Sequence, residues 1–244
     1  MTLAMAGCNL PVVSGSGVPA PSAPAVVPQA QCSDWLRLQH TGQGTLYGLD
    51  ATASTLRMLV FRGGRLASLG HNHVIAAEQH AQGQIYLPKD GLTTAGAELA
   101  FRLDQLVLDA PVWRTAMGDE FAKTLSDADI AGTRANMLKA LDADTFPLVK
   151  ASTVAVTGGW PRPVLTLGVW LHGQYRTVEL PVEAIRPEGE APLRAKGRMV
   201  VRQSDFGIRP FTVLGGLLAI QDALVVELDL VARPTSACAP LPDA

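Results

Sequence analysis

The sequence predicts an all-β fold, an antiparallel barrel with one substantial helix. Apolar and polar residues alternate along most segments after Leu46, the period of a strand with one face in water and the other in a core. The chain contains 23 Gly and 17 Pro, as many short strands joined by turns require. One segment, about 126–141, instead carries apolar residues at helical spacing.

The clearest strand pattern runs from 223 to 231. Leu224, Val226 and Leu228 share one face, while Glu227 and Asp229 lie on the other. The same alternation recurs in three other segments, 97–104, 176–182 and 194–202. A fourth segment, 164–171, is apolar on both faces, so it is either covered on both sides or faces a bound lipid across the barrel wall.

The helix has recognisable boundaries. Ser126 can cap its first turn, with Asp129 three residues later in an imperfect capping box. The approach to Pro147 ends the helix near residue 141. About eight strands with one helix favour a closed barrel, and an eight-stranded barrel has an interior just wide enough for side chains or one slim ligand.

The composition supports a folded protein and excludes some functions. Of the 244 residues, 48% are hydrophobic and 17% charged, enough apolar material for a sizeable core. The formal net charge is −2, so no basic surface is available for nucleic acid. Apolar runs stay well below the roughly 20 residues that a transmembrane helix needs.

The N-terminal region indicates export. Residues 1–8 end in Ala-Gly-Cys, similar to a bacterial lipobox in which Cys8 would be lipidated, although no Lys or Arg precedes Arg37. Residues 9–34 are rich in Pro, Ala, Ser and Gly and are predicted to be a disordered tether. We therefore expect a periplasmic, membrane-anchored lipoprotein; a buried or incidental Cys8 is the alternative.

Two further cysteines flank the folded part, predicted to span 35–234 and to be followed by a tail, 235–244. Cys32 lies just before it and Cys238 just after it. In an oxidising compartment this pair could form a disulfide that joins the two ends of the domain. For so long a loop the chain-entropy estimate is roughly 5 kcal/mol.

Several short segments, taken together, resemble one family. They are Y-G-L-D (47–50), G-H-N-H-V-I (70–75), T-R-A-N-M-L (133–138), F-P (146–147), L-T-L-G-V-W-L-H-G (165–173), R-T-V-E-L-P (176–181) and R-Q-S-D-F-G-I (202–208). Their order resembles the YceI-like, polyisoprenoid-binding family, and the G-H-N-H segment looks like a periplasmic subgroup. The resemblance covers about 46–232.

This resemblance implies an elongated, lipocalin-like, eight-stranded antiparallel barrel in the bacterial periplasm. An isoprenoid or similar long apolar lipid would lie along the barrel axis. The expected partners are this lipid and a membrane, with no nucleic acid and a homodimer as one option. The resemblance implies no enzymatic activity and no cofactor apart from a bound lipid of the isoprenoid or quinone type.

Candidate ligand contacts are residues of the barrel lining and of its mouth. They are His71, His73, Phe101, Trp113, Arg134, Met137, Trp170, Met199, Phe206, Leu224, Val226 and Leu228. Several have a structural alternative. Arg134 could bond a strand end, Trp113 could pack on the surface, and Phe206 could simply fill the end of the barrel. Trp170 could belong to the core.

His71 and His73 have three interpretations. As residues i and i+2 of a strand they project from the same face, so they could contact a head group at the mouth. They could instead be two ligands of a zinc site, with a third from His80, His172, Asp205 or another carboxylate. Hydrogen bonds within a turn or barrel rim are the structural alternative.

Two other functions remain as alternatives to lipid binding. One is a structural envelope lipoprotein whose barrel is filled by its own side chains. The other is a His-based metal-binding protein or metallo-hydrolase. The sequence has no G-x-S-x-G elbow, phosphate loop or dinucleotide fingerprint, which weighs against the common enzyme classes.

Overall fold

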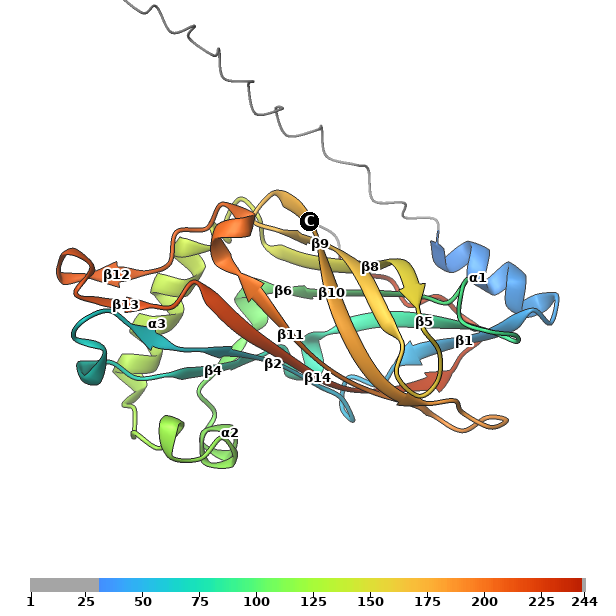
Figure 1. Cartoon of the computed structure of the whole chain (residues 1–244), viewed down its shortest axis with the longest axis horizontal. Coiled ribbons are helices and arrows are strands. Elements are labelled where there is room, and N and C mark those ends of the chain that lie inside the picture. Colours follow the sequence, from blue (N-terminus) through green and yellow to red (C-terminus); the bar gives the residue numbers. More distant parts are fainter. Residues whose placement is uncertain (1–30, 243–244) are drawn as a thin grey trace, which may run out of the picture.

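Eight antiparallel strands close into a barrel, as the alternating pattern predicted. The computed structural model describes residues 31–242. The wall runs in the order β1, β5, β6, β8, β9, β10, β11 and β14, and β14 pairs back onto β1 (Figure 1). These strands are β1 (Gly44–Leu49), β5 (Gln82–Pro88), β6 (Gly96–Arg102), β8 (Leu148–Thr157), β9 (Val164–Leu171), β10 (Gln174–Ile185), β11 (Leu193–Arg202) and β14 (Ala223–Pro234).

The wall forks at one end of the barrel. The end of β14 pairs with β1, whereas its first half, over 225–229, pairs with β2 (Thr55–Val60). From β2 the sheet continues through β4 (His73–Ala76) to β7 (Val107–Leu108). A small second sheet consists of β3 (Arg62–Gly63), β12 (Thr212–Val213) and β13 (Leu218–Ile220).

The predicted helix is present as α3 (Asp127–Ala140), at the same end of the molecule as β12 and β13 (Figure 1). The capping box is complete, because Asp129 N donates to Ser126 Oγ and Ser126 N donates to Asp129 Oδ2. Ile130, Met137 and Leu138 pack against the barrel core. The helix therefore covers the end of the barrel where the wall forks.

A second helix, α1 (Gln31–His40), corrects the predicted domain boundary. Its first four residues, 31–34, were expected to belong to the tether. Buried Cys32 and Trp35 hold the helix against the barrel, and the Trp35 ring stacks on Tyr86 with 6.3 Å between centroids. Tertiary packing thus orders residues that have little helical signal of their own. Residues 1–30, including Cys8, lie outside the described residues.

The structure contains the disulfide between Cys32 and Cys238, with 5.9 Å between the two Cα atoms. The segment that follows β14 packs on the barrel as well, since Thr235 N donates to the Leu46 carbonyl oxygen at 2.9 Å. The start of the predicted tail is therefore part of the folded domain. Within residues 31–242, no helix has the length and apolar character needed to cross a membrane.

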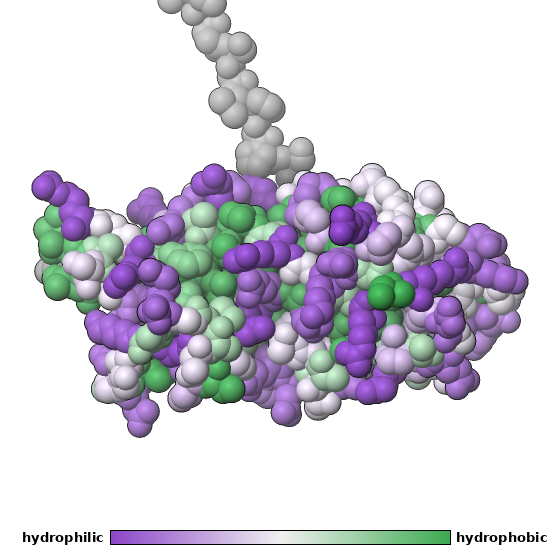
Figure 2. Space-filling model, turned by 60° about the horizontal axis from the view of Figure 1, so that its bottom comes forward, coloured by the Kyte–Doolittle hydropathy of each residue, from purple (hydrophilic) through white to green (hydrophobic). Residues whose placement is uncertain are grey.

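The outward rows of β11 and β14 carry charged side chains that pair across the two strands. Lys196 of β11 pairs with Asp229 of β14 at 2.9 Å, and Arg198 pairs with Glu227 at 3.3 Å. Figure 2 shows one face of the molecule, on which hydrophilic side chains surround scattered apolar ones. The apolar partners of these rows point the other way, into the barrel.

Candidate ligand-binding cavity

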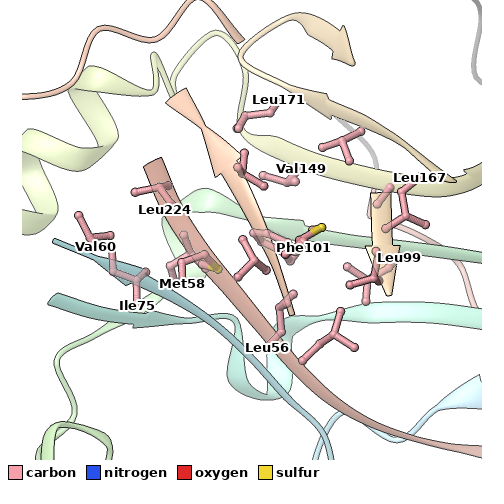
Figure 3. Close-up of a pocket in the computed structure, with 18 of the residues that line it drawn as sticks. Leu56, Met58, Val60, Ile75, Leu99, Phe101, Val149, Leu167, Leu171 and Leu224 are labelled. Carbon is pink, nitrogen blue, oxygen red and sulfur yellow. The ribbon is translucent and has the colours of Figure 1, made fainter. Parts of the chain in front are cut away.

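The barrel encloses a cavity of about 460 Å³. Its wall is formed by the inward rows that the alternation predicted, including Leu224, Val226 and Leu228 of β14. Figure 3 shows Leu56, Phe101, Leu167 and other apolar side chains converging on this space from strands on different sides of the barrel. Cavities of this size are typical of sites for small molecules.

Strand β9 is the segment that is apolar on both faces, and each face is covered in a different way. Leu165, Leu167, Val169 and Leu171 of β9 line the cavity. Trp170 has the opposite orientation, because neighbouring strand residues point to opposite faces. Its ring packs on Tyr175 of β10, with 4.9 Å between the ring centroids. The second apolar face of β9 is thus covered by an aromatic side chain outside the barrel.

Eight of the twelve candidate ligand contacts line the cavity. They are His71, His73, Phe101, Met137, Met199, Leu224, Val226 and Leu228. They come from strands β4, β6, β11 and β14, from helix α3 and from the turn before β4. Their contact with a ligand stays a prediction, but the fold brings them to one space.

The other four candidates lie outside the lining, and each has a structural role instead. Trp113, in α2 (Pro111–Ala116), packs against the cluster of Leu59, Val74 and Phe121. Arg134 of α3 donates to the carbonyl oxygens of Leu106 and Asp104, at 2.5 and 2.8 Å. This is the structural role that the sequence analysis gave as the alternative to ligand contact. These two side chains join the outer elements to the barrel.

Trp170 and Phe206 complete this group. Trp170 is on the outer face of β9, as described above. Phe206 is 1% exposed and belongs to the core, but it does not line the cavity. Its carbonyl oxygen lies 3.0 Å from His172 Nδ1. Once the inward residues of β9 are known, its alternation puts Trp170 on the outer face of the barrel. Phe206 lies in a turn, where no strand periodicity predicts the direction of its side chain.

A buried polar cluster lies next to the cavity, formed by His73, Asp109 and Arg114. His73 Nδ1 is 2.6 Å from Asp109 Oδ2, and Arg114 Nη1 donates to Asp109 Oδ1 over 2.6 Å. The Asp109 side chain is 0% exposed. The Val74 backbone N–H donates to the same carboxylate at 3.0 Å. Asp109 thus receives hydrogen bonds from three residues of two elements, β4 and α2.

These hydrogen bonds determine the charge of Asp109. Burial raises the pKa of its carboxyl, but the hydrogen bonds from His73, Val74 and Arg114 outweigh burial, so the net pKa is lowered. Asp109 is therefore ionised at neutral pH, and the Arg114 guanidinium balances its charge. Sequence reasoning missed Asp109, which is 36 residues from His73 and adopts a left-handed φ of 55°.

His71 lies beside this cluster and also lines the cavity. Its ring meets that of His73 edge to face, with 4.6 Å between centroids. Its Nδ1 atom is buried and has no hydrogen-bond partner among the described residues. Burial, followed by the nearby positive charges, lowers the pKa of His71, so its ring is neutral at pH 7.

Asn72, between the two histidines, anchors the turn. Its Oδ1 accepts from the Arg62 backbone N–H at 3.0 Å, and its Nδ2 donates to the Glu120 carbonyl oxygen at 3.0 Å. The G-H-N-H segment therefore has two sides, one bonded to neighbouring loops and one facing the cavity. Across residues 31–242, no three His, Cys, Asp or Glu side chains are grouped as a metal site would require.

Comparison with known proteins identifies the fold. No protein-family model matches the sequence, and neither does any curated protein. Among solved structures, BcnA of Burkholderia cenocepacia matches with a TM-score of 0.53 and 13% identity, over 75% of this chain and 98% of that one. A YceI protein of Campylobacter jejuni matches with a TM-score of 0.41 and 12% identity, over 57% of this chain and 72% of that one.

The likeness to BcnA shows a shared fold. The eight-stranded antiparallel barrel with one substantial helix, which the YceI-like resemblance implied, is confirmed by the strand order itself.

Proposed function

We propose that this protein binds a long apolar lipid, of the isoprenoid class, inside its barrel. The observation that carries the proposal is the 460 Å³ cavity, which the aliphatic rows enclose without filling. An apolar chain placed there would gain roughly 25 cal/mol for each Å² of apolar surface removed from water. Because the wall is a closed sheet, the site is formed in advance and little ordering is needed on binding.

The cavity also bears on the alternatives. A purely structural barrel would have its interior filled by its own side chains, because unfilled apolar space lowers stability. The lining here is dominated by Leu, Val, Ala and Ile. Such a surface offers a lipid dispersion contacts and few groups for chemistry, so we assign the protein a role in binding rather than in catalysis.

We further propose that the protein works in the bacterial periplasm, anchored to a membrane through a lipid on Cys8. The disulfide between Cys32 and Cys238 supports an oxidising compartment, because such bonds are rare where thiols are kept reduced. The long segment before α1 would then separate the barrel from the membrane.

Extraction of the purified full-length protein with organic solvent, followed by mass spectrometry, tests the proposal. We expect a prenyl alcohol, phenol or quinone in an amount comparable to that of the protein. Protein that carries no lipid and fails to take up an apolar fluorescent probe would contradict lipid binding. A stoichiometric metal in the same preparation would favour the metal-binding alternative.

A further inference from the structure

The cavity has a polar region at the end covered by α3. His73 pairs with Val60 in the β2–β4 ladder, and Figure 3 shows Val60 and Ile75 on the side of the cavity nearest this helix. His71 and His73 both line the cavity there. A lipid whose tail lies among the aliphatic rows would therefore place its head group beside two imidazole rings.

The buried polar cluster determines what His73 offers to that head group. An ionised carboxylate only accepts hydrogen bonds, so His73 must donate to Asp109 from Nδ1. In the neutral ring the other nitrogen, Nε2, then carries a lone pair and acts as an acceptor. Asp109 thus orients the ring and selects its tautomer, which leaves one acceptor atom for a ligand.

His71 offers the complementary group. Its buried Nδ1 has no partner in the described part of the chain, and a buried polar atom of this kind normally finds one. In the tautomer that carries the proton on Nδ1, a neutral His71 can donate a hydrogen bond. A donor and an acceptor therefore lie on two rings that are 4.6 Å apart.

The two guanidinium groups near these rings already have carboxylate partners. Arg114 pairs with Asp109, and Arg62 donates to the Gly70 carbonyl oxygen and lies 3.9 Å from Glu120. Lys123, from the loop before α3, donates to the Leu69 carbonyl oxygen, and Asp129 caps the helix. An anionic head group would therefore have to compete with Asp109 and Glu120 for these guanidinium groups, whereas a neutral polar group would meet its hydrogen-bonding needs.

We propose that His71 and His73 form a subsite for the hydroxyl of a neutral prenyl lipid, whether an alcohol, a phenol or a quinol. One hydroxyl can donate to His73 Nε2 and accept from His71 Nδ1–H, so it satisfies both atoms at once. An ether, an ester or an oxidised quinone cannot donate in this way. This inference rests on the proposed lipid-binding function and adds the chemistry of the head group.

Two lipids with the same tail test the subsite, namely geranylgeraniol and its methyl ether. Their dissociation constants are measured on the full chain by displacement of an apolar fluorescent probe. We expect the wild-type protein to prefer the alcohol by roughly threefold to tenfold, the value of one net hydrogen bond in a buried site. Geranylgeranyl phosphate, the anionic counterpart, should bind no more tightly than the alcohol.

Two variants separate the head-group contact from folding. In His73→Asn the amide nitrogen can still donate to Asp109, but the acceptor Nε2 is lost. His71→Phe removes a side chain with no hydrogen bond to the protein in the described residues and keeps the edge-to-face ring contact. In His73→Asn the preference for the alcohol should fall to about one, because only the alcohol can donate to Nε2. In His71→Phe the alcohol and the ether should both bind roughly threefold to tenfold more weakly, because either oxygen can accept from His71, and the preference for the alcohol should remain.

The outcomes distinguish this inference from the function on which it rests. Equal binding of alcohol and ether to the wild type, a preference unchanged in His73→Asn, or tighter binding of the phosphate would overturn the hydroxyl subsite and leave the lipid-binding proposal standing. If the protein binds neither the alcohol nor the ether, the proposed function fails and the subsite fails with it.

Discussion

His73 and Asp109 lie in contact on the β2–β4–β7 branch of the forked wall, with 2.6 Å between Nδ1 and Oδ2. Strand β4 carries the histidine, and the aspartate follows β7, the strand that pairs with β4. The carboxylate also accepts from the Arg114 guanidinium, so a buried negative charge connects a cavity-lining ring to helix α2.

Replacing Asp109 should destabilise the fold. In Asp109→Asn the buried Arg114 guanidinium loses its counter-charge, which for a buried pair costs about 3 kcal/mol or more. The free energy of unfolding in urea measures the loss. Asp104→Asn is the matched control, because Asp104 pairs with Arg102 at the surface and such a pair is worth at most about 1 kcal/mol. Equal losses in the two variants would contradict a structural role for the cluster.

Acid should reduce stability through His71. Its folded-state pKa lies below the unfolded value, so the unfolded chain binds the proton first as the pH falls. The stability present above 6.5, the ordinary pKa of a histidine, is therefore lost on acidification below it. His71→Phe should show a shallower decline between pH 7 and pH 5 when melting temperatures are compared, as every other histidine is retained. A decline as steep as that of the wild type would disprove the assignment.

Filling the cavity should abolish lipid binding without unfolding the barrel. Ala151 of β8 lines the cavity between Leu99 and Val169 of the neighbouring strands. In Ala151→Trp the indole would occupy part of the lumen, so affinity for an apolar probe should fall at least about tenfold. Val154→Trp, in the same strand but at a residue that is 56% exposed, should bind normally. Melting curves establish that both variants are folded, and normal binding by Ala151→Trp would place the lipid elsewhere.

Removing the disulfide should lower stability by up to about 5 kcal/mol, because the bond restricts an unfolded loop of 206 residues. The double variant Cys32→Ser/Cys238→Ser should unfold at a lower concentration of urea than the wild type. Reductant should lower the stability of the wild type to that of the variant and leave the variant unchanged. If reductant leaves the wild type as stable as before, the bond contributes nothing.

Local patterns predicted most of the barrel. Alternation placed Leu224, Val226 and Leu228 on the inner face of β14 because the period of a strand is short and is recorded directly in the sequence. The start of the helix could be predicted as well, because Ser126 and Asp129, which form its cap, are only three positions apart. Features that a few neighbouring residues determine could be found without coordinates.

Features that depend on distant residues could not be found in this way. Asp109 meets His73 only because β4 and β7 pair, and the two residues are 36 positions apart in the chain. Helix α1 is held by Cys238 and by the stacking of Trp35 on Tyr86, which lie far along the chain. The sequence allows Arg134 to contact either the ligand or a strand end. The position of α3 in the fold brings its guanidinium to the backbone carbonyl groups.

The bond between Cys32 and Cys238 turns the segment from α1 to the end of β14 into a covalent ring. A protease that cuts one surface loop, such as the exposed turn at Glu188–Glu190, would open this ring without separating it into two molecules. Every strand of the wall would stay attached to its neighbours. The nicked protein would therefore keep its mass on a non-reducing gel and fall into two fragments only after reduction.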